Sequence, residues 1–161
     1  MKEKETILIL ENLRSAENVG SIFRTADACG ITQIILIGTT PCPIDRFKRA
    51  RKDIAKSSLG AEKNIPWKYA KTIGPLLKKL HSEKFCLIAL EQNPQSEDYK
   101  KFLRARIKND CAIIIGNEPK GIPLSTLNKV DTIAEIPMRG SKESLNVSVA
   151  TGIFLSRFLN L

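Results

Sequence analysis

The sequence predicts a single α/β domain with one parallel sheet and helices on both faces of that sheet. Short, continuous apolar runs recur along the chain, as is typical of strands that are covered on both sides. Between them lie segments whose apolar residues repeat at helical spacing. A length of 161 residues fits one domain with a proper core.

The first part of the chain predicts a strand–helix–strand unit, with strands at 7–10 and 32–37. Asn18 is a good helix N-cap, and Gly30 is a good terminator for the same helix. The helix carries apolar residues at i, i+3, i+4 and i+7, namely Val19, Ile22, Phe23 and Ala26. Such a unit is the basic element of a parallel α/β sheet.

The rest of the chain continues this alternation. We expect a short extended piece at Trp67 and Tyr69. The elements expected after it are a helix at 73–80, a strand at 85–90, a charged helix at about 99–108, a strand at 111–115, a short helix and a strand at 132–136. The last helix carries an apolar stripe at Val147, Ala150, Phe154 and Phe158.

The charge balance favours a polyanionic partner. The chain has 26 Lys and Arg against 17 Asp and Glu, which gives a net charge of +9 and a pI near 9.5. Nucleic acid and an anionic membrane surface are both compatible with this charge. No segment approaches the roughly 18 apolar residues of a membrane span, and the first apolar run stops at Leu10. We therefore expect a cytoplasmic protein without a membrane partner.

The cysteines and the histidine do not predict a metal site. None of the four cysteines forms a CxxC pair, and Cys86 and Cys111 lie in apolar runs that predict strands. We expect these two to be buried free thiols. The only histidine, His81, lies in a polar stretch that predicts a surface position.

A basic run lies between the second strand and Trp67. Its cations are Arg46, Lys48, Arg49, Arg51, Lys52 and Lys56. A solvated helical face is the simplest interpretation. We favour contact with nucleic acid, because Asp45 and Asp53 are the only acids before Glu62. The small donors Ser57 and Ser58 at the end of the run would suit phosphate oxygens.

Three unusual loops follow predicted strands, where ligands of parallel sheets bind. They are EQNP after Leu90, GNEPKG after Ile115 and MRGSKESLN after Pro137. Neither GxGxxG nor GxxxxGK[ST] is present. Glu118 precedes a proline and is therefore held stiffly. It is either a turn carboxylate that binds local N–H groups or a group that shares a pocket with Ser144 and Asn146. The segment at 136–154 is likewise either a capped turn or a ligand loop.

Three segments in this order resemble the SpoU (TrmH-like) RNA ribose methyltransferases of the SPOUT superfamily. NVGSIFRTA at 18–26 resembles their first motif and IIGNEPKGI at 114–122 resembles the second. IPM at 136–138 and SLNVSVA at 144–150 resemble the third. Lys56-Ser57-Ser58 before Gly60-Ala61 is similar to a further family segment. The resemblance covers nearly the whole chain.

The resemblance implies a SPOUT-type fold with a C-terminal trefoil knot, although true knots are otherwise almost absent from proteins. It implies S-adenosylmethionine as the cofactor, RNA as the substrate and a homodimer that uses the first-motif helix and the final helix. By analogy, the cofactor would be bound by Leu90, Gly116, Asn117, Gly121, Ile136, Met138, Ser144 and Leu145. Residues 1–161 would form the catalytic domain without a separate RNA-binding domain, so the basic run would help to select RNA.

The implied reaction transfers a methyl group to a ribose 2′-hydroxyl in tRNA or rRNA, and we prefer tRNA. The catalytic residues by position are Arg24, Asn18, Glu118, Ser144 and Asn146. An arginine pKa above ~12 argues against Arg24 as the base, so we expect it to bridge a phosphate and the developing oxyanion. The alternative is a non-catalytic RNA-binding protein that keeps the fold.

Overall fold

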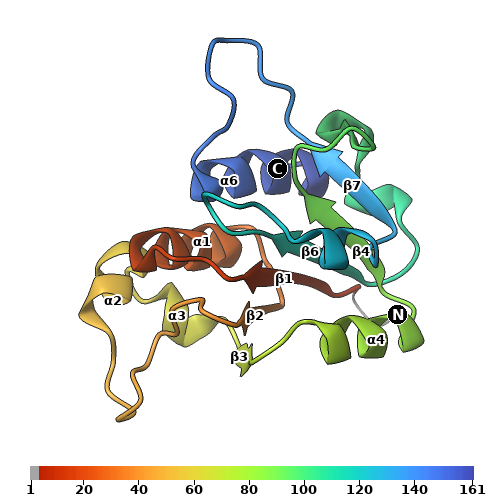
Figure 1. Cartoon of the computed structure of the whole chain (residues 1–161). Coiled ribbons are helices and arrows are strands. Elements are labelled where there is room, and N and C mark those ends of the chain that lie inside the picture. Colours follow the sequence, from red (N-terminus) through yellow and green to blue (C-terminus); the bar gives the residue numbers. More distant parts are fainter. Residues whose placement is uncertain (1–3) are drawn as a thin grey trace.

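The computed structural model describes residues 4–161, and its seven strands form one parallel sheet (Figure 1). The strand order is β3-β2-β1-β6-β4-β7-β5, and every pair is parallel. The strands are β1 (Thr6–Glu11), β2 (Gln33–Ile37), β3 (Trp67–Ala70), β4 (Cys86–Leu90), β5 (Glu97–Asp98), β6 (Cys111–Ile115) and β7 (Thr132–Glu135).

Helices cover both faces of the sheet, as the sequence predicted. The α-helices are α1 (Ala16–Ala28), α2 (Lys52–Ser58), α3 (Ala61–Asn64), α4 (Gly74–Ser82), α5 (Leu124–Leu127) and α6 (Val147–Leu159). One core cluster joins α1, α2, α3 and α6 to the sheet through side chains such as Phe23, Ile54 and Phe154. The other joins α4 and α5 through Leu77 and Leu127.

Burial on both faces explains why the strands have continuous apolar sequences. Along β1, Leu8 and Leu10 belong to the first core cluster, whereas Ile7 and Ile9 belong to the second. The strands also end together at one edge of the sheet. Ile115 of β6 lies opposite Leu10 on one side and Leu90 on the other. The loops after these strands therefore begin at neighbouring points.

Helix α1 begins earlier than the sequence predicted. Its N-cap is Ser15, whose side chain accepts a hydrogen bond from the backbone N–H of Asn18 at 3.1 Å. The prediction of Asn18 as the N-cap was wrong, because Ser15 caps the helix and Asn18 already lies inside it, with its backbone N–H bonded to the Ser15 side chain. The side chain of Asn18 is consequently available for contacts outside the helix. The predicted end of the helix is confirmed, since Gly30 follows it with a φ of +71°.

The predicted helix at 99–108 is absent, and that prediction was also wrong. The segment instead forms two short 3₁₀ helices, η1 (Tyr99–Lys101) and η2 (Arg104–Arg106), directly after β5. Arg104 explains the difference, because its guanidinium donates to Thr6 Oγ1 at 2.8 Å and to the carbonyls of Glu5 and Ile107. These contacts with the start of β1 hold the chain in an irregular path, so tertiary contacts override helix propensity.

The cysteines are free thiols. Cys111 is buried, whereas Cys86, which lies opposite it on the neighbouring strand, is only half-buried. His81 is exposed, as the sequence predicted, and its Nε2 lies 2.7 Å from the carbonyl oxygen of Lys129. Within residues 4–161, no helix has the length and apolar character needed to cross a membrane. The same residues contain no cluster of three or more His, Cys, Asp or Glu side chains that could hold a metal ion.

Candidate active site

A cavity of about 410 Å³ lies where the loops after β4, β6 and β7 meet the start of α6. The lining combines apolar side chains with polar groups and exposed backbone. The lining residues are Leu90, Glu91, Gln92, Ile115, Gly116, Asn117, Glu118, Pro119, Lys120, Gly121, Ile136, Met138, Glu143, Ser144, Leu145, Val147 and Ala150. The cavity thus joins the three loops that the sequence singled out.

All the residues that were expected to bind the cofactor line this one cavity. They are Leu90, Gly116, Asn117, Gly121, Ile136, Met138, Ser144 and Leu145. They come from three segments that are far apart in the sequence. Leu145 leaves 37% of its surface open. An apolar side chain that faces an open cavity in this way provides a contact surface for a flat, apolar part of a ligand.

The segment at 116–122 forms a tight turn in which both glycines are required. A Cβ on Gly116 would lie 2.5 Å from Ile122 Cγ1 and 2.6 Å from its backbone nitrogen. Gly121 has a φ of +67°, a conformation that favours glycine. The amide of Asn117 stabilises the turn, because its Nδ2 donates to the Asn12 carbonyl at 2.6 Å and its Oδ1 accepts from Lys120 N at 3.1 Å. The turn therefore presents backbone to the cavity at close range.

Glu91 is a site residue that the sequence analysis missed. Its Oε2 accepts a hydrogen bond from Ile122 N at 2.8 Å, and its Oε1 accepts one from Gln92 N at 2.9 Å. A Cβ on Gly121 would lie only 2.3 Å from Oε2. This carboxylate therefore connects the loop after β4 to the turn after β6. Its place as the first residue of the EQNP loop was the available signal.

Glu118 connects the turn after β6 to the start of α1. Its carboxylate accepts hydrogen bonds from Arg14 N at 3.0 Å, Ser15 N at 3.2 Å and Asn18 Nδ2 at 3.1 Å. Partial burial opposes ionisation of Glu118, but these hydrogen bonds outweigh it and lower the pKa of the carboxyl. Both interpretations of Glu118 therefore hold in part. It lines a cavity together with Ser144, which Asn146 does not line, and N–H groups satisfy it, although they belong to a distant segment.

Asn18 continues this connection to the last loop. Its Oδ1 accepts a hydrogen bond from Asn146 Nδ2 at 3.1 Å. Asn146 is also the N-cap of α6, because its Oδ1 accepts from Ser148 N at 2.9 Å and from Ser148 Oγ at 2.7 Å. A chain of hydrogen bonds thus runs from Glu118 through Asn18 to Asn146. It links the first, second and third motifs.

Arg24 and Ser144 lie outside the chain of hydrogen bonds that joins the other expected catalytic residues. Ser144 lines the cavity and is exposed, in a loop at 136–146 that projects from the body of the molecule (Figure 1). Arg24 is an exposed residue of α1 and does not line the cavity. In a single chain Glu118 and Ser144 therefore line the cavity, and Asn18 and Asn146 are joined to Glu118 by hydrogen bonds, whereas Arg24 does not line the cavity.

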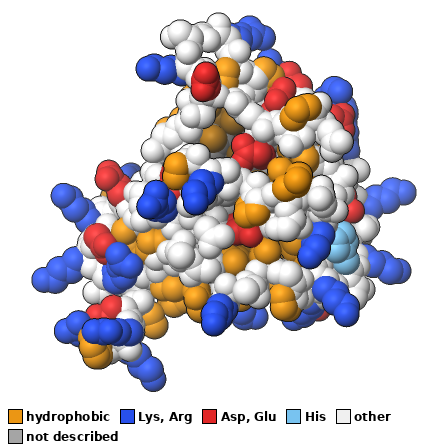
Figure 2. All heavy atoms as spheres, in the orientation of Figure 1, with side chains coloured by type: hydrophobic (Ala, Val, Ile, Leu, Met, Phe, Trp, Pro, Cys, Tyr) orange, Lys and Arg blue, Asp and Glu red, His pale blue; other side chains and the backbone are white. Residues whose placement is uncertain are grey.

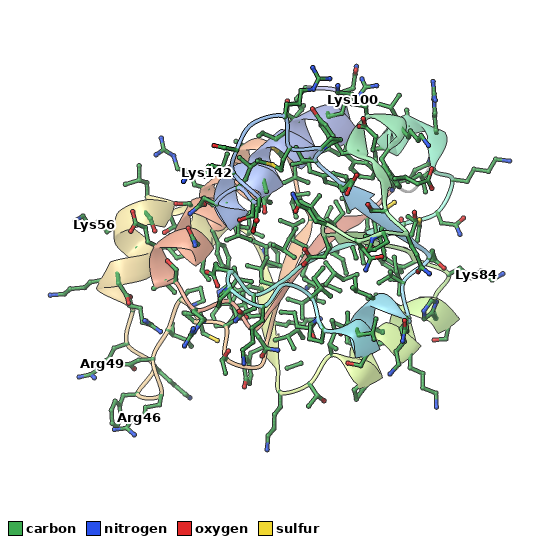
Figure 3. The ribbon with its side chains drawn as sticks, turned by 45° about the horizontal axis from the view of Figure 1, so that its top comes forward. Arg46, Arg49, Lys56, Lys84, Lys100 and Lys142 are labelled. Atoms are coloured by element: carbon green, nitrogen blue, oxygen red, sulfur yellow. The ribbon has the colours of Figure 1, made fainter. Side chains whose placement is uncertain are left out.

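The basic run forms the projecting loop at 43–51 and the exposed side of α2, where Arg46, Arg49 and Lys56 point outward (Figure 3). The two acids of this segment compensate only part of the run, as the sequence predicted. Arg49 pairs with Asp45 at 2.9 Å, and Arg51 pairs with Asp53. Within residues 4–161, no carboxylate lies within 4.0 Å of the other cations of the run, which are Arg46, Lys48, Lys52 and Lys56.

Ser57 and Ser58 do not serve as the phosphate donors that the sequence suggested. The Ser57 hydroxyl donates to the Ile54 carbonyl at 3.2 Å, and the buried Ser58 hydroxyl donates to Glu62. A Cβ on Gly20 would lie 2.0 Å from Ser57 Oγ. The Ser57 hydroxyl therefore belongs to the close packing of α1 against α2, and the Ser58 hydroxyl connects α2 to α3.

The comparisons with known proteins agree with these motifs. The model of the SpoU rRNA Methylase family matches residues 5–156. The 23S rRNA (guanosine-2'-O-)-methyltransferase RlmB of Ralstonia nicotianae is 32% identical over 149 residues, which make up 92% of this chain and 56% of that protein. A TrmH family tRNA/rRNA methyltransferase of Staphylococcus aureus is 34% identical over 157 residues, or 96% of this chain and 59% of that protein.

A solved structure gives the same result. The AdoMet-bound rRNA methyltransferase from Sinorhizobium meliloti superimposes with a TM-score of 0.82 at 29% identity, over 97% of this chain and 56% of that one. The chain spans little more than half the length of each of these three proteins. The family model nevertheless matches almost the whole of this chain, so the chain belongs to the SpoU rRNA methylase family.

Proposed function

We propose that this protein is a cytoplasmic, S-adenosylmethionine-dependent methyltransferase that methylates a ribose 2′-hydroxyl in tRNA or rRNA. One observation carries the proposal. The segments that resemble the second and third family motifs meet around one cavity, Asn18 of the first is hydrogen-bonded to both, and every residue that the resemblance assigns to the cofactor lines the cavity. The relatives named as rRNA and tRNA/rRNA methyltransferases, and the AdoMet-bound neighbour, support the same activity.

The residues of the cavity fit this cofactor. A volume of about 410 Å³ is within the usual range for small-molecule sites, about 300–1,000 Å³. Met138 and Leu145 offer apolar surface to the adenine, and the turn at 116–122 offers backbone groups. The carboxylates of Glu91, Glu118 and Glu143 favour a ligand with a positive sulfonium. When bound, the cofactor supplies the methyl group that is transferred.

The hydrogen-bonded chain from Glu118 to Asn146 would position the reacting groups. Glu118 stays ionised and orients the amide of Asn18, which in turn orients the amide of Asn146. Because Oδ1 of Asn146 caps α6 and one N–H of its Nδ2 donates to Asn18, only the second N–H remains for the substrate side. Ser144 would hydrogen-bond the ribose hydroxyl. Arg24 would bind the adjacent phosphate and stabilise the developing oxyanion.

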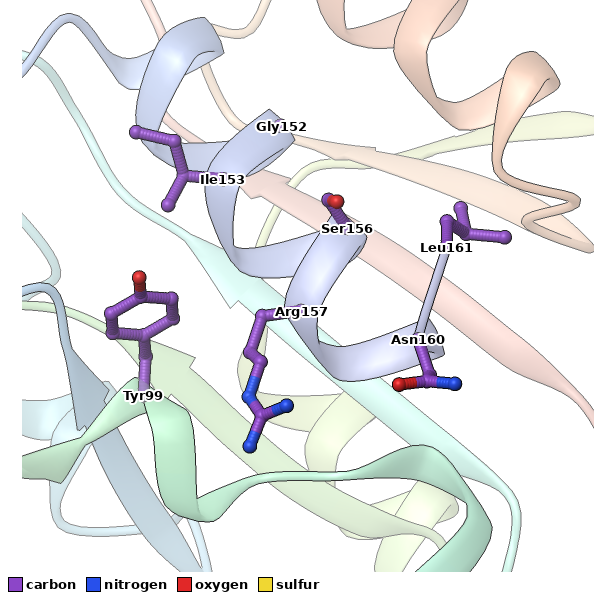
Figure 4. Close-up of a pocket in the computed structure, with 7 residues that line it drawn as sticks. All are labelled: Tyr99, Gly152, Ile153, Ser156, Arg157, Asn160 and Leu161. Atoms are coloured by element: carbon purple, nitrogen blue, oxygen red, sulfur yellow. The ribbon is translucent and has the colours of Figure 1, made fainter.

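We infer that a homodimer brings Arg24 to the chemistry. Helix α6 exposes Val149 by 49% and Ile153 by 37%, on the side away from the buried Phe154. A hollow of about 530 Å³ beside Ile153 is shown in Figure 4. Gly152 lies close to Thr25, the residue after Arg24. A second copy on this surface would therefore contact the part of α1 that carries Arg24. Ile153→Lys is expected to give a monomer in sedimentation velocity and to abolish turnover.

We also infer that the loop at 136–146 takes part in the knot that the resemblance implies. Strand β6 pairs with one edge of β4, and β7 pairs with its other edge. The chain must consequently cross β4 between these strands, and it then returns to α6 beside α1. Such a crossing is the kind of path that a knotted C-terminal segment requires.

Labelled S-adenosylmethionine incubated with bulk RNA tests the activity, followed by mapping of ribose methylation. We expect label at a 2′-hydroxyl with the wild type. Arg24→Ala is expected to bind the cofactor normally, as measured by calorimetry, and to lose turnover. Cofactor binding without label in any RNA pool would instead favour the non-catalytic RNA-binding alternative. Full turnover by Arg24→Ala would remove Arg24 from the mechanism.

A further inference from the structure

The loop at 43–51 has a defined hairpin geometry. Ile44 and Ala50 form an antiparallel bridge, and Asp45 N donates to the Arg49 carbonyl at 2.9 Å. Lys48 N donates to the Asp45 carbonyl at 3.0 Å, and Lys48 has a φ of +61°. This is a tight turn that ends in a left-handed residue, a common three-residue hairpin connection. The loop is therefore an ordered projection.

The carboxylate of Asp45 fixes the end of this hairpin. Its Oδ1 accepts from Phe47 N at 2.7 Å and from Arg49 N at 3.0 Å, while its Oδ2 accepts from Arg49 Nε at 2.9 Å. These hydrogen bonds, above all the one from the Arg49 backbone, lower the pKa of Asp45. The backbone around Phe47 is thus held in place before any ligand arrives, which reduces the entropy that binding would cost.

Phe47 exposes 61% of its surface at the end of the hairpin. The guanidinium of Arg46 lies 4.7 Å from the centre of its ring, and that of Arg49 lies 5.0 Å from it. Figure 2 shows cationic side chains gathered around apolar atoms at this projection, at the lower left. A single exposed apolar residue is ordinary on a protein surface. An exposed ring flanked by two guanidinium groups on an ordered hairpin is instead typical of a stacking platform.

The surroundings suit a nucleic-acid strand. A hollow of about 700 Å³ lies between the hairpin and the start of α2, and Arg46, Arg51 and Lys52 help to line it. Arg46 and Lys48 have no carboxylate within 4.0 Å in the described part of the chain, so both cations can contact phosphates. A base stacked on Phe47 would leave its phosphates close to these cations.

We propose that residues 46–49 bind an unpaired base of the RNA substrate, with Phe47 stacking on the base and the adjacent cations holding its phosphates. The inference rests on the proposed function and specifies the substrate class. An aromatic side chain can stack only on a base whose face is open, as in a loop, bulge or single strand. The substrate is therefore an RNA with an unpaired segment, and an uninterrupted duplex is a poor ligand.

Phe47→Ala tests this proposal in a binding assay without turnover. The probes are a fluorescent RNA hairpin and the fully paired duplex with the same stem sequence. Base stacking is worth about 1–3 kcal/mol per base, so we expect at least about a fivefold loss of hairpin affinity. Duplex binding should stay the same, and Phe47→Trp should retain hairpin affinity. Leu124→Ala, which removes an equally exposed apolar side chain on α5, is the matched control and should bind as the wild type does.

Arg46→Gln separates the phosphate contacts from the base contact. It should weaken hairpin and duplex equally and reduce the slope of log affinity against log salt by about 0.7–0.9. Phe47→Ala should leave that slope unchanged. Phe47→Ala with wild-type hairpin affinity, or with an equal loss for the duplex, would overturn the proposal. So would a wild type that binds the hairpin no better than the duplex. Hairpin preference without methylation of any RNA would instead overturn the proposed activity and leave the stacking site in place.

Discussion

The cavity and the loop at 43–51 are built in opposite ways. The cavity depends on hydrogen bonds between distant segments, such as Glu118 to Arg14 and Asn146 to Asn18. The loop depends on contacts within seven residues of the chain, from Ile44 to Ala50, and nearly all of them involve Asp45. The cavity therefore requires the complete fold, whereas the loop requires only its own turn.

This difference suggests how the molecule separates cofactor chemistry from RNA recognition. A change in a side chain that connects two loops of the cavity, such as Glu91 or Glu118, alters the positions of both loops. A change in the 43–51 loop alters only that loop. We therefore expect substitutions at the connecting and closely packed positions of the cavity to affect stability and cofactor binding together, and substitutions in the loop at 43–51 to affect RNA binding alone.

Gly116→Ala should have the largest effect. The new Cβ would lie 2.6 Å from Ile122 N and 2.7 Å from the carbonyl carbon of Gly121, so backbone must move. Overpacking of this kind costs about 1–3 kcal/mol. We also expect cofactor affinity to fall at least tenfold, which corresponds to about 1.4 kcal/mol. Chemical denaturation and calorimetry with S-adenosylmethionine measure the two effects.

Gly140→Ala is the matched control for that substitution. Gly140 lies in the exposed loop at 136–146, and a Cβ there would have no atom within 4 Å. It should change neither stability nor cofactor affinity. If Gly116→Ala behaved like Gly140→Ala, the turn at 116–122 would not shape the cofactor site.

Glu118→Gln should have an intermediate effect. The substitution keeps the shape of the side chain and weakens the hydrogen bonds that Arg14 N and Ser15 N donate to it. Because the carboxylate is partly exposed, these two hydrogen bonds contribute about 1 kcal/mol to stability in total. Because folding lowers the pKa of Glu118, its contribution is present above the unfolded pKa of about 4.3 and is lost as the pH falls through the folded value. The stability difference from the wild type should thus be constant near neutral pH and shrink in acid.

Urea denaturation at several pH values measures this difference. Glu143→Gln is the control, because Glu143 is an exposed carboxylate that lines the same cavity. Its stability should follow the wild type at every pH. A Glu118→Gln protein with the same pH profile as the wild type would show that Glu118 does not connect the loops energetically.

The sequence predicted the sheet well because its strands are buried on both faces. An apolar run such as 111–115 has few alternatives in a protein of this size. The helix predicted at 99–108 failed for a different reason. Arg104 binds Thr6 and Glu5, about 100 positions earlier, and no local pattern reports such a contact. The Asn18 N-cap failed because Ser15, three residues earlier, was an equally good cap.

The site was predictable to the extent that motifs carry it. The resemblance placed Leu90, Met138 and the other expected cofactor residues, which the fold then gathers at one cavity. Neither the hydrogen bond from Ile122 to Glu91 nor the link from Asn18 to Asn146 could be predicted, because each depends on which loops become neighbours in space. The stacking arrangement around Phe47 likewise depends on side-chain positions at the end of a turn, whereas the sequence gives only the charges.

Asp45→Asn should have the smallest effect on the whole protein. It therefore tests most directly whether the loop at 43–51 is independent of the cavity. It removes the ion pair with Arg49 from an exposed hairpin, so global stability should stay close to that of the wild type. The amides of residues 44–50 should exchange faster. Affinity for the RNA hairpin should fall about threefold, because ordering a loosened side chain costs about 0.5–1.5 kcal/mol.

Asp53→Asn, which breaks the pair with Arg51 outside the turn, is the control and should leave exchange at 44–50 unchanged. Calorimetry with S-adenosylmethionine completes the test, since a changed cofactor affinity in Asp45→Asn would mean that the loop and the cavity are coupled after all.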